Sequence, residues 1–271
     1  MLESKRMNRN RVSLIVIVYY LLASLLAFLL GLVQPVTGIP EVVVQLTQFG
    51  PTLAVLAVLW LLPRSRSLHS PSMITAGSQA EGPRRLAEAV LLPVAVIALS
   101  LLWYGMTGHS TDFTKPTSLS HPFWLIVIAQ FIGAAGEEIG WRLFMQPALQ
   151  TRMSVLASSV LVGLLWGVWH IGVFAEGWRY AGSFLLFAVS ISVILGELLR
   201  RPHGLKLPTA AAFHMLINLG MLLWFKEESG DAYAMTTMAI ACFIVAVITL
   251  IAHAASAAKG AKRTTARGRG I

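Results

Sequence analysis

Eight apolar stretches constrain the fold of this 271-residue chain more than any other feature. A helix needs about 20 mostly apolar residues to cross the hydrocarbon core of a bilayer. The segments between the stretches are short and rich in Pro, Gly, Ser and charge, which is typical of turns. The sequence therefore predicts an all-α fold, a polytopic transmembrane helical bundle of about eight spans. The stretches are Val12–Val33, Val42–Leu62, Leu86–Trp103, Phe123–Gln146, Ser154–Phe174, Ala181–Leu199, Leu207–Phe225 and Tyr233–Ala255.

The composition excludes the common soluble classes. Hydrophobic residues make up 56% of the chain and charged residues 12%, whereas soluble domains carry about 25% charged residues. So few charges cannot cover a water-soluble globule of this size, and a single cysteine excludes a disulfide scaffold. We expect one transmembrane helical domain over residues 1–255, with a motif-bearing core at 123–225. A basic, disordered cytoplasmic tail is expected at 256–271.

The basic residues indicate how the bundle is oriented. If the N-terminus is cytoplasmic, 18 of the 21 Lys and Arg residues fall on the cytoplasmic side, and Lys115, Arg179 and Lys226 fall outside. This asymmetry is the positive-inside pattern of membrane proteins, and with an even number of spans it predicts that both termini are cytoplasmic. The net charge of +9 is then expected to meet anionic lipid rather than nucleic acid. We expect an integral, multi-pass protein of the plasma membrane of a prokaryote.

Three charged residues lie where a bilayer penalises them. The fourth stretch contains Glu137, Glu138 and Arg142, and each such residue costs about 2.5–3.5 kcal/mol near the centre of a spanning helix. Glu138 and Arg142 are four residues apart, so they share a helix face and can form an ion pair. Glu137 is rotated by about 100° and is left for another partner or for chemistry. The alternative is that both glutamates end the helix at the cytoplasmic interface, paired with Arg142 and Arg152.

Polar residues also gather on two later stretches. His170 lies in the fifth, and His214 and Asn218 lie four residues apart on one face of the seventh. Taken singly, each of these residues is typical of a structural side chain that forms a hydrogen bond between helices. Together with the three charged residues they supply the parts of a hydrolytic site. A Glu can act as a base on water, a His can position that water, and His and Asn donors can stabilise an oxyanion.

Other polar residues near the span ends are expected to be structural. Glu88 follows Arg84 by four residues, and Glu197 precedes Arg200 by three, so both spacings predict ion pairs on a helix. His253 lies near the end of the last stretch, where we expect a solvated side chain.

At these residues the sequence resembles the CPBP family of intramembrane proteases, which includes CAAX prenyl-protein endopeptidases and proteins linked to bacteriocin processing. The family pattern is E-E-x-x-x-R, then F-x-x-x-H, then H-x-x-x-N or D. Here the first motif runs from Glu137 to Arg142 and the third from His214 to Asn218. The second departs from the pattern, because Trp166 stands where the family usually has Phe before His170.

The resemblance implies a role for each residue. Glu137 would be the base that activates water, and Glu138 and Arg142 would support and orient Glu137. His170 would hold the water. His214 and Asn218 would stabilise the oxyanion. Glu137, His170 and His214 could also supply three zinc ligands, although no H-E-x-x-H helix is present. A metal-free mechanism is equally compatible with the sequence.

The resulting hypothesis is an intramembrane endopeptidase that cleaves a membrane-associated or prenylated, CAAX-type peptide or protein with Glu-activated water. Two alternatives stay open. Buried Glu and His also build proton relays, as in a proton-coupled transporter. A non-catalytic immunity or scaffold protein could keep the same helices.

Overall fold

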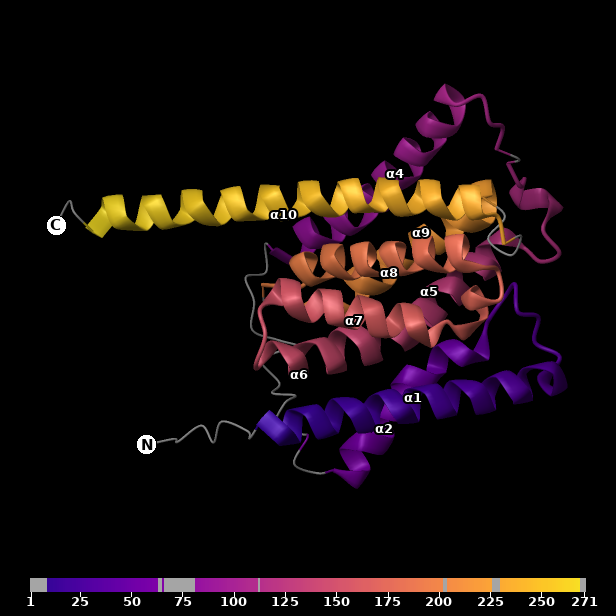
Figure 1. Ribbon diagram of the computed structural model, residues 1–271, viewed down its shortest axis with the longest axis horizontal. Helices are drawn as coiled ribbons and strands as arrows, with labels where there is room; N and C mark the ends of the chain where they lie inside the picture. Colours follow the sequence, from indigo (N-terminus) through magenta and orange to yellow (C-terminus); the bar gives the residue numbers. More distant parts are fainter. Residues whose placement is uncertain are drawn as a thin grey trace.

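The structure is a computed structural model that describes residues 9–62, 65, 81–111, 113–201, 204–225 and 230–268, and within these residues it is built from helices (Figure 1). Short 3-10 turns lie at Leu46–Phe49 (η1), Pro116–Ser118 (η3) and Ile171–Phe174 (η5), and π-helical turns at Trp141–Met145 (η4) and Met221–Phe225 (η6). The α-helices are α1 (Arg9–Thr37), α2 (Gly50–Leu61), α4 (Glu81–Met106), α5 (Phe123–Gly140), α6 (Gln146–Gln150), α7 (Val155–Trp169), α8 (Trp178–Leu198), α9 (Lys206–Gly220) and α10 (Ala232–Gly268).

Successive long helices run in alternating directions through the bundle, so α1 begins and α10 ends at the same end, on the left of Figure 1. We call this the basic end, because Arg84, Arg85, Arg152, Arg200 and Arg201 lie in the helix ends and turns there. Lys115 and Arg179 lie at the opposite end. The predicted all-α bundle of apolar helices is confirmed. Which end faces the cytoplasm stays a prediction.

Six helical segments of the described chain are long and apolar enough to cross a membrane, and two apolar segments, Leu46–Leu61 and Val155–Trp169, are shorter. Both short segments fall inside predicted spans. The fifth predicted span, Ser154–Phe174, starts where the structure has it, because Ser154 caps α7 by accepting from the Ala157 amide at 3.1 Å. It ends early, because a 3-10 turn replaces the helix after His170. A 15-residue helix is about 22 Å long, shorter than the hydrocarbon core.

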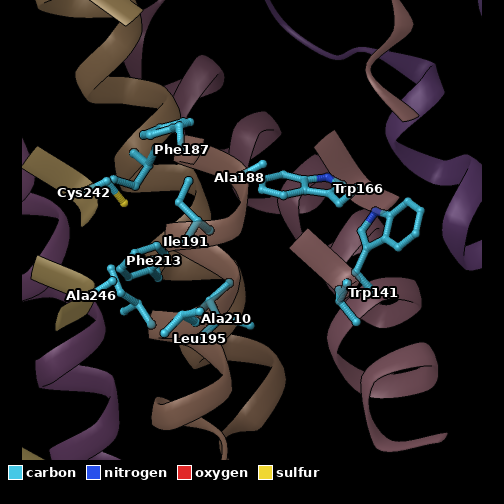
Figure 2. Close-up of a cluster of buried hydrophobic side chains, with 14 of the residues drawn as sticks. Trp141, Trp166, Phe187, Ala188, Ile191, Leu195, Ala210, Phe213, Cys242 and Ala246 are labelled. Carbon is cyan, nitrogen blue, oxygen red and sulfur yellow. The ribbon is translucent and has the colours of Figure 1, made fainter. Parts of the chain in front are cut away.

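The helix α8 lies at the centre of the packing, between α7 on one side and α10 on the other. Figure 2 shows Phe187, Ile191 and Leu195 of α8 next to Phe213 of α9 and Cys242 of α10. All five side chains are buried. On the remaining sides, α5 packs against α9 and α2, and α1 packs against α2. The two helices that carry the first and third motifs, α5 and α9, are therefore direct neighbours.

Small residues let α7 approach α8 closely, as in many membrane helix pairs. A Cβ atom built at Gly163 of α7 would lie 2.6 Å from the Cα atom of Val189 and 2.9 Å from the carbonyl oxygen of Ala188. Both neighbours are backbone atoms, which cannot move out of the way without shifting a helix. The position of α7 on α8 therefore depends on the absence of a side chain at Gly163.

The last helix differs from the prediction at its end. The sequence analysis expects a disordered tail from residue 256, whereas α10 continues as helix to Gly268. Its segment 254–262 is rich in Ala and Lys, which have high helix propensity. The domain boundary at residue 255 stays a prediction.

A polar network ties three helices together at the basic end. Arg85 donates from Nη1 to Oε2 of Glu88 at 2.7 Å, and its Nη1 lies 2.9 Å from Nε2 of His253 on α10. Since the guanidinium is only a donor, His253 accepts at Nε2, which leaves Nδ1 to donate to Glu197 of α8 at 3.2 Å. His253 is thus part of a network, and the expectation of a solvated side chain was wrong.

The two ion pairs predicted from spacing are confirmed. Arg84 lies 3.0 Å from Glu88 and Arg200 lies 3.3 Å from Glu197.

The close approach of α7 and α8 leads to a stability prediction. Gly163→Ala should destabilise the bundle by about 1–3 kcal/mol, because the added methyl group must displace helix backbone. Gly182→Ala is the matched control on α8, since a Cβ atom there meets no atom within 4 Å. Thermal unfolding of both variants in detergent measures the difference. Equal midpoints for the two variants would contradict the packing argument.

Candidate active site

The first motif lies where an α-helix passes into a π-helical turn. Glu137 and Glu138 are in the last turn of α5, and Arg142 is in the π turn η4 that follows. Such turns are common at functional sites because they change which face of the helix a side chain occupies. Gly140 lies between them, and a Cβ atom there would meet the Tyr19 hydroxyl of α1 and the ring of Pro51. The motif is therefore enclosed by α1 and α2.

All three charged side chains of the motif are buried. Glu137 is 2% exposed, Glu138 is fully buried and Arg142 is 2% exposed. The alternative in which both glutamates end the helix at a membrane interface predicts exposed carboxylates. Their burial in the interior favours the buried ion-pair interpretation instead.

Glu138 is paired on both of its oxygens. Its Oε2 forms an ion pair with Nε of Arg142 at 3.4 Å, without a hydrogen bond, and the two residues have the predicted spacing of four. Its Oε1 lies 2.9 Å from Nδ1 of His214 on α9. A carboxylate can only accept, so Nδ1 of His214 carries the proton and Nε2 is the free ring nitrogen. One carboxylate therefore joins the first motif to the third.

Glu137 has a different partner, which the sequence analysis did not assign. Trp166 of α7 donates from Nε1 to Oε2 of Glu137 at 2.7 Å, within the buried interior. The Arg142 guanidinium lies over the same indole ring, 4.7 Å from its centroid, which is within cation–π range. Figure 2 shows Trp166 beside Ala188 of α8. The residue that departs from the family pattern thus contacts two of the three charged groups of the first motif, Glu137 and Arg142.

His170 lies one helical turn beyond Trp166, at the end of α7. Its Nδ1 lies 2.9 Å from the Trp166 carbonyl oxygen, which can only accept, so Nδ1 is the protonated nitrogen. Its ring makes edge contacts with the rings of Trp166 and Trp169, at 5.3 and 4.9 Å between centroids. The Trp166 ring also packs edge-on against His214 at 5.4 Å. Trp166 therefore lies between the two histidines.

Asn218 lies on the predicted face of α9 but has an unpredicted partner. Its Nδ2 donates to Oε1 of Gln130, two turns before Glu137 on α5, at 3.2 Å. Asn218 is half-buried. The structure thus brings Glu137, Glu138, Arg142 and His214 together, with His170 behind Trp166 and Asn218 toward Gln130. Neither Trp166 nor Gln130 carries a charge that would have marked it from the sequence.

The donor set does not fit a three-ligand metal site. Within the part of the chain that the structure describes, no three His, Cys, Asp or Glu side chains are grouped closely enough to hold a metal ion. Nδ1 of each histidine donates to a protein oxygen, which leaves Nε2 as the ring nitrogen that could bind a metal. Zinc binding by Glu137, His170 and His214 stays a prediction to be tested by chelation.

The fold and the site define a polytopic helical membrane protein with a buried, charge-paired cluster of hydrolytic residue types. Comparison with known proteins agrees with this class. Residues 119–220 match the family described as "Type II CAAX prenyl endopeptidase Rce1-like". The resemblance predicted from the three motifs is therefore confirmed over the segment that contains them.

Curated relatives extend the similarity over most of the chain. The lysostaphin resistance protein A of Staphylococcus aureus, from strains Newman and USA300, is 26% identical over 246 residues. The match covers 89% of this chain and 58% of the relative. This chain thus spans little more than half the length of these relatives.

The unequal pairing of the two glutamates predicts unequal effects on stability. Glu138→Gln should destabilise the protein by about 3–5 kcal/mol, because it leaves Arg142 buried without its counter-charge. Glu137→Gln should cost less than about 1 kcal/mol, since the amide oxygen of Gln can still accept from Trp166. Thermal unfolding in detergent compares the two isosteric variants. A larger loss for Glu137→Gln would contradict the assigned ion pair.

Proposed function

We propose that this protein is an intramembrane endopeptidase in which Glu137 activates water for attack on a peptide bond. The observation that carries the proposal is the asymmetry of the adjacent glutamates. Glu138 is held by Arg142 and His214, whereas Glu137 is held through one oxygen by an uncharged indole. A carboxylate that is not committed to an ion pair has a lone pair available to take a proton from water. Glu137 is therefore suited to accept a proton, and Glu138 to organise the groups around it.

In the proposed reaction Oε1 of Glu137 takes a proton from water as the water oxygen attacks the carbonyl carbon. His170 assists, because its Nδ1 proton is held by the Trp166 carbonyl and its Nε2 lone pair can accept from the same water. The resulting tetrahedral intermediate then collapses. The C–N bond breaks, and the proton on Glu137 passes to the leaving amine.

The negative charge on the intermediate needs donors. His214 supplies one from Nε2 when its ring is doubly protonated, a form that the Glu138 carboxylate on Nδ1 stabilises. Asn218 supplies a second from Nδ2, which donates to Gln130 in this structure. Both residues lie on α9, one turn apart.

The substrate class follows from the family likeness and from the buried position of the site. We propose that the substrate is a membrane-associated peptide or protein, and that a prenylated CAAX-type C-terminus is one member of that class. The name of the similar Staphylococcus aureus proteins refers to resistance to lysostaphin, which keeps the non-catalytic alternative open. Activity measurements on a defined set of peptides separate these functions.

Removal of the Glu137 carboxylate should abolish cleavage without unfolding the protein. We expect Glu137→Gln to lower kcat at least about 1,000-fold, since the base is lost while its size and its Trp166 contact are kept. The assay uses purified protein in detergent with a prenylated CAAX peptide and an unprenylated peptide library, each with and without a chelator.

Each outcome of this assay favours one function. Cleavage that depends on Glu137 and resists chelation supports the metal-free mechanism, and cleavage abolished by chelation supports zinc. Undiminished cleavage by the Glu137→Gln variant would remove Glu137 from the mechanism. A folded wild type that cleaves nothing favours the transporter or the non-catalytic resistance protein.

Trp166 offers a second test, because the family residue at this position is available as a variant. Trp166→Phe keeps an aromatic ring under Arg142 but removes the N–H that holds Glu137. Since a hydrogen bond to a charged group contributes about 1.5–3 kcal/mol, we expect kcat to fall about 10- to 100-fold with little change in KM. Steady-state kinetics measure both constants. An unchanged kcat would mean that Trp166 only fills space.

A further inference from the structure

A cleft of about 920 Å³ opens between α1 and the end of α7, away from the buried carboxylates. Its walls come from α1, from the segment that joins α1 to α2, from the 3-10 turn η5 and from the start of α8. Small ligand pockets measure about 300–1,000 Å³, so this cleft has room for several residues of an extended chain. Among the six motif residues, His170 is the one that lines it.

An aromatic layer separates the cleft from the charged cluster. Tyr20 lines the cleft, and its ring lies 6.2 Å from the ring of Trp141. Trp169 also lines the cleft and lies 5.7 Å from Trp141. His170 stands beside this layer and contacts Trp166, which holds Glu137. A chain bound in the cleft would therefore meet the site at His170.

The charges along the cleft are of one sign. The described residues that line the cleft include two acidic residues, Glu41 and Glu176, and no Lys or Arg. Both are exposed. Polar side chains of Ser24, Gln45 and Thr47 share the lining. Apolar residues such as Phe28, Leu32 and Ile171 make up most of the lining and suit an apolar segment, while the two carboxylates complement a basic side chain.

The cleft also offers approachable backbone. Ser24, Ala27 and Gly31 place small residues on the α1 wall. On the opposite wall a Cβ atom built at Gly172 meets no atom within 4 Å, so the turn η5 presents bare backbone to the cleft. These small residues leave room for a chain to lie close to both walls of the cleft.

The cleft lies at the end of the bundle opposite the basic end. Glu41 follows the end of α1, Glu176 precedes α8, and Gly230 precedes α10. The end of α1 and the starts of α8 and α10 lie on the right of Figure 1. If the basic end is cytoplasmic, as the distribution of Lys and Arg predicts, the cleft opens to the outer face.

We propose that this cleft binds the substrate as an extended, apolar peptide segment with a basic side chain between Glu41 and Glu176, and that the segment enters from the outer face. The inference rests on the proposed protease function and names its substrate class.

A binding experiment tests the cleft without requiring catalysis. The probe is a photoactivatable apolar peptide with one arginine, compared with the same peptide carrying glutamine instead, and both are added to the full-length Glu137→Gln variant in detergent. We expect crosslinks to α1 between Ala27 and Leu32 and to η5. Glu41→Gln combined with Glu176→Gln should weaken binding of the arginine peptide about fivefold and leave the glutamine peptide unchanged.

A steric variant provides the control for folding. Gly172→Leu should fill the cleft and lower peptide binding at least about tenfold, whereas Gly182→Leu, at an exposed position outside the cleft, should not. In the protein that keeps Glu137, Gly172→Leu should block cleavage and Gly182→Leu should retain it. Wild-type binding by the Gly172→Leu variant, crosslinks outside the cleft, or a bound lipid that the peptide cannot displace would overturn the proposal. Cleavage by wild type that Gly172→Leu leaves intact would refute the cleft while sparing the protease.

The side of entry is tested by labelling. Gly172→Cys places a thiol on the cleft, and the native Cys242 is fully buried and should stay unlabelled. An impermeant maleimide added to intact cells should label this variant. Labelling that appears only after permeabilisation would overturn entry from the outer face, and no labelling under either condition would overturn an open cleft.

Discussion

The buried ion pair between Glu138 and Arg142 is the interaction on which the rest of the site depends. Charges in the interior of a membrane bundle are costly unless they are paired and hydrogen-bonded. Glu138 forms an ion pair with Arg142 along its own helix, without a hydrogen bond, and accepts a hydrogen bond from His214 across to α9. The same pairing fixes the contact between α5 and α9. Because Arg142 and His214 both pair with Glu138, its neighbour Glu137 is left without a cationic hydrogen-bond partner.

Trp166 connects the ion pair to the packing of the bundle. Its indole covers Arg142 and donates to Glu137, so its position affects both charges. That position is set by α7, which is held against the backbone of α8 by the absence of a side chain at Gly163. A shift of α7 by even a fraction of an ångström would lengthen a hydrogen bond of 2.7 Å. The polar site therefore depends on an apolar contact between two helices that carry none of its carboxylates.

The sequence predicted contacts within one helix, and it missed contacts between helices that are far apart in the chain. The Glu138–Arg142 pair follows from a spacing of four within one helix, and this regularity survives the π turn. The contact of Trp166 with Glu137 and that of Asn218 with Gln130 depend on the register between helices that are far apart in the sequence. No periodicity within a single helix encodes that register.

The same division explains the differences at the helix ends. Hydropathy located the apolar stretches, but the fifth includes a 3-10 turn that is as apolar as a helix. His253 looked solvated because its partners, Arg85 and Glu197, come from two other helices. Conversely, the basic segment after residue 255 looked disordered by charge, while its Ala content favours continued helix.

The cleft and the carboxylates are separated by aromatic side chains, and this arrangement orders the groups along the proposed path. Water and peptide arriving through the cleft would meet His170 first, whose Nδ1 is already fixed by the Trp166 carbonyl. Glu137 lies behind Trp166, 2% exposed. In the proposed mechanism Trp166 orients Glu137 through its N–H and contacts His170 through its ring, so one side chain connects the group that meets the cleft to the proposed base.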